Sequence, residues 1–345
     1  MAETARPIVV LTDDTIHPAG AERLSQSCDV RVLSGSYPSE DLLCDAARDA
    51  VAILARMGVV SRKVIEAAPR LKIIARHGIG VDAVDLAAAT EKGVIVTTTG
   101  AVNAGAVAEY AFALLLGLAR MIPQADQGMR EGLWRREPLV GLELAGKTMG
   151  IIGLGSIGKH MARQALGFRM KVIAQDPHAR PPADLDVEMV ERHELLARAD
   201  VISLHMRLDA VSRGTIDAAS IAAMKPTAVF VNTSRGELVD ETALIAALQE
   251  GRIGGAALDV YENEPLSPDS PLRKLPNVLL SPHVAGQTAD AMRVVAIAAA
   301  DAILAEISGR IPPYVYNPEA YDVRGGSGAG GSGGFGANHS EGSTK

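Results

Sequence analysis

The sequence predicts an α/β protein built from two doubly wound parallel-sheet domains that are joined by two long helices. With 345 residues, the chain is longer than a single hydrophobic core usually supports. Short aliphatic runs alternate with helical patterns in two successive series, which is typical of βαβ units. Aromatic residues make up 3% of a chain that is 48% hydrophobic, so burial depends on aliphatic side chains, as in covered parallel strands.

The first series supplies four expected strands and the helices between them. The strand-like runs are 8–11, 51–54, 71–75 and 94–97. Helical patterns cover 39–49 and 61–68, and a short helix over 85–92 is closed by Gly93.

Two long apolar helices are expected to connect the domains. The first covers 104–121 and is stopped by Pro123; because it is short and contains Glu109, it suits a buried helix better than a membrane span. The second covers 288–307 and returns the chain to the first domain. We therefore predict one domain of 1–102 plus 288–322 and another of 103–287. Residues 323–345 are a Gly/Ser-rich tail that is expected to be disordered.

The second series contains a glycine motif in the context that dinucleotide binding requires. Its expected strands are 148–152, 171–174, 201–204, 228–232, 255–258 and 278–280. Gly153, Gly155 and Gly158 form the pattern GxGxxG between the first of these strands and a helix over 159–166. The glycines permit a tight turn, backbone approach to a pyrophosphate and close helix packing. This predicts a Rossmann domain for 103–287.

The cofactor preference depends on the end of the next strand. Asp176 follows that strand at the spacing of the ribose-binding carboxylate, which accepts hydrogen bonds from a 2′-hydroxyl and repels a 2′-phosphate. We therefore expect NAD rather than NADP, a preference that the nearby Arg180 would weaken.

Composition excludes several other classes of function. The formal net charge of −7 gives no basic footprint for nucleic acid. Cys28 and Cys44 lie in no CxxC pattern, which argues against a disulfide scaffold and a zinc site. The N-terminus shows no signal-peptide pattern, so a cytoplasmic location is expected.

Three polar residues follow strands of the second series, where open parallel sheets place their ligands. They are Arg235, Glu264 and His283. Histidine transfers a proton in either direction near neutrality, and a carboxylate partner orients its ring. A guanidinium binds a substrate carboxylate through paired hydrogen bonds. Together they suit hydride transfer at the carbinol carbon of a 2-hydroxy acid, without a metal.

With these motifs, the sequence resembles the D-isomer-specific 2-hydroxyacid dehydrogenase family, and within it the 3-phosphoglycerate dehydrogenases. The matching stretches lie in the family's order between residues 7 and 321: 78–82 (GIGVD), 146–158 (GKTMGIIGLGSIG), 232–236 (NTSRG), 257–265 (ALDVYENEP) and 281–283 (SPH). The resemblance implies a flavodoxin-like substrate domain and catalysis by Arg235, Glu264 and His283. It further implies cofactor contacts, beyond the three glycines, at Ser156, Ile157, Asp176, Thr233, Ser234, Arg235, Asp259, His283 and Gly286. Backbone N–H groups of Gly78, Ile79 and Gly80 would bind the substrate carboxylate.

The match has two departures and one open question. Relatives usually carry His-x-Pro-Leu where this chain has His205-Met-Arg207-Leu, and His77 stands where phosphoglycerate enzymes tend to have a small residue. Arg56 and Arg76 resemble the phosphate-side arginines of those enzymes. The alternative is that both are ordinary surface arginines with no role in substrate binding.

Substrate and assembly therefore stay open among named alternatives. 3-Phosphoglycerate is one candidate substrate; hydroxypyruvate, glyoxylate and lactate-like acids are others. A related NAD enzyme that acts on formate or phosphite is a second alternative, and Glu264 argues against the formate type. A non-enzymatic NAD-sensing adaptor is a third alternative. We expect a homodimer through the NAD-binding domain, with Trp134 and Arg135 near the neighbour's site, no membrane partner, and no appended regulatory domain with serine feedback.

Overall fold

The computed structural model describes residues 5–35, 37–134, 136–137 and 139–325, and it confirms the predicted fold class. The chain divides into two compact units, one of Met1–Thr99 with Ala296–Lys345 and one of Gly100–Val295. The second boundary lies inside helix α11 (Ala289–Ile307), eight residues beyond the 287/288 boundary that the sequence suggested.

The first unit contains a five-stranded parallel sheet in the order β2-β1-β3-β4-β5. Its strands are β1 (Ile8–Leu11), β2 (Asp29–Val32), β3 (Ala52–Ala55), β4 (Ile73–Arg76) and β5 (Ile95–Thr97). The sequence missed β2, because this edge strand is largely exposed and carries Asp29 and Arg31 instead of an aliphatic run.

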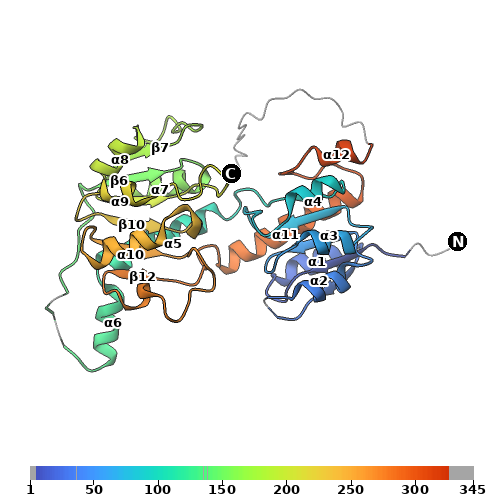
Figure 1. The fold of residues 1–345 in the computed structure, drawn as a ribbon, viewed down its shortest axis with the longest axis horizontal. Helices are drawn as coiled ribbons and strands as arrows, with labels where there is room; N and C mark the ends of the chain where they lie inside the picture. The colour runs from blue at the N-terminus through green and yellow to red at the C-terminus, as the bar shows by residue number, and fades with distance from the viewer. Residues whose placement is uncertain (1–4, 36, 135, 138, 326–345) are drawn as a thin grey trace, which may run out of the picture. The chain divides into compact units, whose positions relative to one another are not determined.

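Helices cover both faces of this sheet (Figure 1). Helix α1 (Pro18–Ser25) and the C-terminal half of α11 pack on one face. Helices α2 (Glu40–Ala47), α3 (Arg62–Ala67) and α4 (Leu86–Glu91) pack on the other. The side chains of Ser39 and Asp85 accept hydrogen bonds from the first turns of α2 and α4, which explains where these helices begin.

The segment after α11 returns along β5 and ends in a short helix. Thr98 donates its backbone N–H to Tyr314, and Tyr316 donates to Val96. Helix α12 (Ala320–Val323) follows, so the expected tail begins three residues later than 323, at the earliest. The predicted disorder of 326–345 lies outside the described residues.

The second unit contains a seven-stranded parallel sheet in the order β12-β11-β10-β9-β6-β7-β8. Its strands are β6 (Thr148–Ile152), β7 (Lys171–Gln175), β8 (Glu188–Met189), β9 (Val201–Leu204), β10 (Val229–Asn232), β11 (Gly255–Leu258) and β12 (Val278–Leu280). The strand order reverses between β6 and β9, and ligands of such sheets bind at the carboxyl ends beside that reversal.

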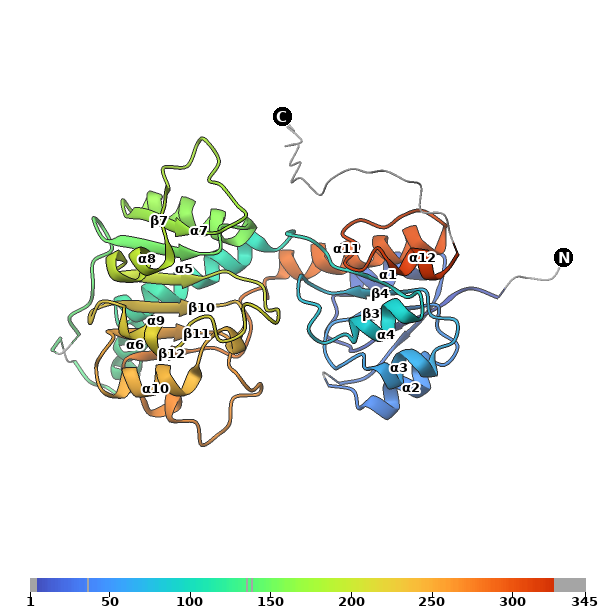
Figure 2. The same ribbon diagram turned by 45° about the horizontal axis from the view of Figure 1, so that its top comes forward.

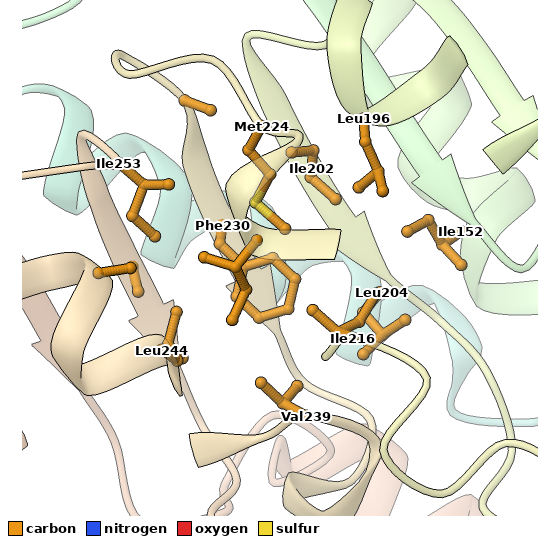
Figure 3. Packing of buried hydrophobic residues seen from close by; sticks show 14 of the residues in the cluster. Ile152, Leu196, Ile202, Leu204, Ile216, Met224, Phe230, Val239, Leu244 and Ile253 are labelled. Carbon is orange, nitrogen blue, oxygen red and sulfur yellow. The ribbon is translucent and has the colours of Figure 1, made fainter. Parts of the chain in front are cut away.

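Two layers of helices enclose this sheet (Figure 2). Helices α5 (Ala104–Ala119) and α7 (Ser156–Gly167) pack on one face. Helices α8 (Arg192–Arg198), α9 (Ala218–Ala222) and α10 (Glu241–Gln249) pack on the other. Phe230 of β10 fills the centre of this second layer, among Leu204, Ile216 and Met224 (Figure 3).

Helix α5 ends earlier than the sequence suggested. It stops at Ala119, and a second helix, α6 (Ile122–Arg130), follows after a bend of 63°. Pro123 lies in the first turn of α6, where backbone N–H groups have no partner within the helix, so the missing N–H of proline costs no hydrogen bond. Pro123 therefore starts the second helix rather than merely ending the first. Within the described ranges, no single helix has the length and apolarity to cross a membrane; only this bent pair passes that test, on length and composition alone.

Candidate active site

A glycine-rich turn joins β6 to α7 at the carboxyl edge of the second sheet. Gly153 has a φ of 93°, and a Cβ there would lie 2.4 Å from the carbonyl oxygen of His205. A Cβ on Gly158 would lie 2.2 Å from the carbonyl oxygen of Gly153, so both positions require glycine. Gly155, at the N-cap of α7, has no atom within 4 Å of its Cβ position. The turn therefore leaves the start of α7, with Ser156 and Ile157, open to a phosphate group.

Asp176 ties the end of β7 to this turn. Its carboxylate accepts three backbone hydrogen bonds, from Leu154 at 2.8 Å, His178 at 2.8 Å and Ala179 at 2.9 Å. Burial alone would raise the pKa of Asp176, but the three N–H donors outweigh burial and lower that pKa. The result is a fixed, ionised carboxylate. Four lone-pair positions on two oxygens leave room for a hydroxyl donor as well.

Glu264 and His283 meet across two neighbouring strand ends. Glu264 lies in the loop after β11, and His283 follows β12, which pairs with β11 in parallel. The imidazole Nδ1 lies 2.7 Å from Glu264 Oε2, while Glu264 Oε1 accepts the backbone N–H of Tyr261 at 3.2 Å. The carboxylate thus fixes the orientation of the ring, and Nε2 is the nitrogen that this contact leaves for proton transfer.

A buried carboxylate holds the His283 loop in an unusual backbone conformation. His283 has a φ of 54°, in the left-handed region. Asp259, which is fully buried, accepts hydrogen bonds from Ser281 Oγ at 2.5 Å and from the N–H groups of Val284 at 3.0 Å and Ala285 at 2.8 Å. Its backbone oxygen also accepts the N–H of His283. Asp259 is therefore a positioning residue; its direct contact with a cofactor stays a prediction.

Arg235 is brought towards the Glu264 loop by a glycine. Arg235 follows β10, and its carbonyl oxygen accepts a hydrogen bond from the Asn232 amide at 2.9 Å. The next residue, Gly236, lies against the backbone of Tyr261: a Cβ on Gly236 would lie 1.8 Å from the Tyr261 carbonyl carbon. Only glycine permits this approach, so the Arg235 and Glu264 loops are in backbone contact.

The remaining predicted cofactor positions lie near the same edge. Ser234 Oγ donates to the carbonyl of Leu204 at 2.6 Å, whereas the buried Thr233 Oγ1 has no partner among the described residues. A Cβ on Gly286 would lie 3.0 Å from the Asn103 amide nitrogen. Sequence reasoning missed Asn103, which reads only as a helix N-cap; in the structure it makes no capping bond, and its buried Oδ1 lacks a described partner.

His205 lines the turn from the end of β9. Its Nε2 lies 2.8 Å from Ser203 Oγ, and burial lowers its pKa to about 4, so the ring is neutral at pH 7. Arg207 in the same loop is exposed. This neutral imidazole adds no charge to the edge of the glycine turn.

The substrate residues that the resemblance implies lie in the first unit, at the carboxyl end of β4. Gly78 has a φ of 143°, and its Cβ position has no atom within 4 Å. The Arg76 Nε donates to the carbonyl of Gly80 at 2.9 Å, and Nη1 donates to the carbonyl of Arg56 at 3.3 Å. The Arg76 side chain thus holds the 78–80 segment in place through the carbonyl oxygen of Gly80.

Arg56, at the end of β3, faces acidic and hydroxyl groups. Its Nη1 lies 3.6 Å from the fully buried carboxylate of Asp13 and also donates to Thr15 Oγ1. Asp13 accepts the backbone N–H of Met57 at 3.1 Å as well, so one buried carboxylate holds the start of the β3–α3 connection. Sequence reasoning did not identify Asp13.

Known proteins of one family match this arrangement. Residues 112–285 match the family model described as D-isomer specific 2-hydroxyacid dehydrogenase, NAD binding domain. A D-3-phosphoglycerate dehydrogenase of Mycobacterium bovis is 40% identical over 92% of this chain, which spans 59% of that protein's length.

A glyoxylate reductase of Korarchaeum cryptofilum is 39% identical over 83% of this chain and 89% of its own. Among solved structures, an NADPH-dependent glyoxylate/hydroxypyruvate reductase from Sinorhizobium meliloti, in complex with NADP and malonate, is similar with a TM-score of 0.81. It is 32% identical and covers 92% of this chain and 98% of its own.

Proposed function

The chain belongs to the D-isomer specific 2-hydroxyacid dehydrogenase family, and from that premise we propose that it transfers a hydride between NAD and C2 of a small 2-hydroxy or 2-keto acid. The observation that carries the proposal is the 2.7 Å contact between His283 Nδ1 and Glu264 Oε2, in the same unit as the glycine-rich turn.

His283 is the proposed acid–base residue. In the oxidation direction it removes the hydroxyl proton of the substrate, and in the reduction direction it returns a proton to the carbonyl oxygen. Glu264 accepts a hydrogen bond from Nδ1–H, which keeps Nε2 directed at one position and stabilises the charged ring when it forms. The loop that Asp259 anchors holds this pair in place.

Arg235 in the second unit and the 78–80 segment in the first are each proposed as a carboxylate-binding element. A guanidinium provides paired donors for a carboxylate and polarises the adjacent carbonyl group. The segment of Gly78, Ile79 and Gly80 offers backbone N–H groups, and Arg76 holds this segment by donating to the Gly80 carbonyl oxygen. Arg76 remains a proposed substrate-side residue through its bond to this segment, and Arg56 remains one through its place at the neighbouring strand end.

The residues of the second unit fit NAD. Gly155 leaves space for a phosphate, and the fixed carboxylate of Asp176 suits a ribose with free hydroxyls. When bound, the nicotinamide supplies the hydride acceptor or donor. The residues proposed to hold it are Gly153, Gly155, Ser156, Ile157, Gly158, Asp176, Thr233, Ser234, Arg235, Asp259, His283 and Gly286.

A homodimer through the second unit is also part of the proposal. Helix α6 has no buried residue, and apolar side chains are exposed on it and on the following segment: Ile122, Met129, Trp134 and Val140. Exposed apolar groups of this kind are typical of an interface. Trp134 is 77% exposed; Arg135 lies outside the described residues. A cytoplasmic location is proposed because both cysteines are free thiols.

The test is NADH oxidation at 340 nm with a panel of 2-keto acids that includes glyoxylate, hydroxypyruvate, pyruvate and 3-phosphohydroxypyruvate. The proposal predicts turnover with at least one of them and a clear preference for NADH over NADPH. If purified protein binds NADH and reduces none of these acids, the chain is not the dehydrogenase proposed here.

A further inference from the structure

The relatives leave the C3 group of the substrate undecided, because a phosphoglycerate dehydrogenase and a glyoxylate reductase match this chain at 40% and 39% identity. A phosphorylated 2-hydroxy acid carries a carboxylate and a phosphate of charge about −1.5 to −2 at pH 7. A protein that binds it must supply cations that are not already neutralised by carboxylates. Whether the cations at the proposed carboxylate-binding edge of the first unit are already paired therefore bears directly on the choice between the two substrate classes.

Arg56, the cation at the end of β3, is already compensated. The Asp13 carboxylate lies 3.6 Å from its guanidinium, and Thr15 Oγ1 accepts from the same nitrogen. Asp13 is fully buried and the Arg56 side chain is 12% exposed, so this ion pair is shielded from solvent screening. Turning Arg56 towards a phosphate would leave a buried carboxylate without its cation, which is strongly unfavourable.

Arg76, the cation at the end of β4, is committed to the backbone. Its Nε and Nη1 donate to the carbonyl oxygens of Gly80 and Arg56. These bonds hold the 78–80 segment, so Arg76 cannot move towards a phosphate without releasing the N–H groups proposed to bind the carboxylate. It contributes long-range positive charge rather than a free pair of donors.

The connection after β3 adds no polar donor from its side chains. Met57, Gly58 and Val59 follow Arg56, and Val59 is 60% exposed. Ser61 is the first hydroxyl after them, and it donates to a carboxylate, Glu40.

The next two cations are paired as well. Arg62 and Lys63, at the start of α3, lie 2.6 Å and 2.7 Å from the carboxylates of Glu91 and Asp41. Across the described part of this connection, every cation therefore faces a carboxylate.

The groups beside Gly78 that lack partners are uncharged. His77 precedes Gly78, and Thr99 donates its backbone N–H to the Gly78 carbonyl. The buried atoms His77 Nε2 and Thr99 Oγ1 have no hydrogen-bond partner among the described residues. Burial, with Arg56 nearby, lowers the pKa of His77 to about 4, so the ring is neutral at pH 7. Neither group therefore adds a charge beside Gly78.

From this arrangement, and resting on the proposed function, we infer that the substrate is a small unphosphorylated 2-hydroxy or 2-keto acid with a hydrogen or hydroxyl group beyond C2, of the glyoxylate and hydroxypyruvate class. Phosphorylated acids are disfavoured because the two arginines at this edge are already engaged, Arg56 by the Asp13 carboxylate and Arg76 by backbone carbonyl oxygens.

Binding to the protein–NADH complex tests the inference independently of turnover. D-Glycerate and 3-phospho-D-glycerate are both reduced acids, so they form dead-end complexes with the NADH form that calorimetry can measure. We expect D-glycerate to bind at least about tenfold more tightly, since an unpaired phosphate loses its hydration without compensation. Equal or tighter binding of 3-phospho-D-glycerate, or no binding of D-glycerate, would overturn the inference.

A parallel turnover assay separates the two claims. Reduction of hydroxypyruvate supports the proposed function. If D-glycerate is preferred in binding but neither hydroxypyruvate nor 3-phosphohydroxypyruvate is reduced, the hydride-transfer proposal fails and the charge argument stands.

A variant with an added positive charge tests whether the lack of a free cation causes the weak binding of the phosphorylated acid. Val59→Lys places one unpaired cation on the exposed β3–α3 connection and should tighten 3-phospho-D-glycerate binding about fivefold, with little change for D-glycerate. Val140→Lys is the matched control, because Val140 is 83% exposed and belongs to the second unit, and the substitution changes net charge equally. An equal gain in both variants, or none in Val59→Lys, contradicts the local charge explanation.

Discussion

Gly236→Ala should separate the two loops that carry Arg235 and Glu264. The added Cβ would lie 1.8 Å from the carbonyl carbon of Tyr261, 2.0 Å from its oxygen and 2.3 Å from the backbone nitrogen of Glu262. All three are backbone atoms, which have no side-chain rotamer to relieve the overlap. Carbon–carbon contacts require about 3.5 Å, so the loops must move apart by about 1.7 Å.

Displacement on this scale should affect catalysis more than cofactor binding. A misplacement of about 1 Å at a reacting centre can lower a rate about 100-fold, so we expect kcat for the preferred 2-keto acid to fall by at least about that factor. NADH affinity should fall less than kcat, because the glycine turn and Asp176 lie on other strand ends and only the proposed cofactor contacts of Thr233, Ser234 and Arg235 move with the loop. The assay is steady-state turnover together with NADH fluorescence titration and circular dichroism, to show that the variant is folded.

Gly167→Ala is the matched control. Gly167 ends α7, and nothing lies within 4 Å of its Cβ position, so this variant should keep wild-type turnover. A folded Gly236→Ala protein with wild-type kcat would refute the argument that backbone contact between the two loops aligns the catalytic residues.

Three further predictions follow from individual contacts. Asp176→Ala removes the ribose acceptor and the partner of three backbone N–H groups, so it should lower the NAD-to-NADP efficiency ratio and also weaken NADH binding; an unchanged ratio would show that Asp176 does not select the cofactor. The pKa of His205 is about 4 when folded and 6.5 in its unperturbed state, so the stability that its burial in neutral form contributes is present above pH 6.5 and is lost as pH falls towards 4. The loss is about 3 kcal/mol, and urea unfolding at pH 7 and pH 4.5 should show a fall that is smaller in His205→Gln; identical pH dependence in both proteins would contradict it. Phe230→Ala should lower the free energy of unfolding by about 3–5 kcal/mol, measured by urea denaturation, because it empties the centre of the packed layer in Figure 3; a loss under about 1 kcal/mol would mean that the layer refills the space.

The sequence was sufficient to predict the fold because most strands here are buried on both faces. Such strands consist of aliphatic runs, and the runs at 148–152, 201–204 and 255–258 coincide with strands in the structure. The strands β2 and β8 were missed because the first is exposed at an edge and the second has two residues. Neither consists of an uninterrupted aliphatic run.

The contacts within the site could be predicted only in part. Strand ends placed Glu264 and His283 at one edge, and the structure brings them within hydrogen-bond distance. The sequence held no sign that Gly236 touches Tyr261, or that Asp13 neutralises Arg56, because both contacts join segments that approach one another only after folding. These contacts govern alignment and substrate charge, which is why motif matching alone left the substrate open.

The central claim is that His283, held by Glu264, transfers the substrate proton. The most direct measurement is single-turnover reduction of the preferred 2-keto acid by NADH in His283→Ala, with the NADH dissociation constant determined on the same protein. The account predicts a rate about 10²–10⁴-fold lower with nearly unchanged NADH binding. A rate equal to that of the wild type would contradict it.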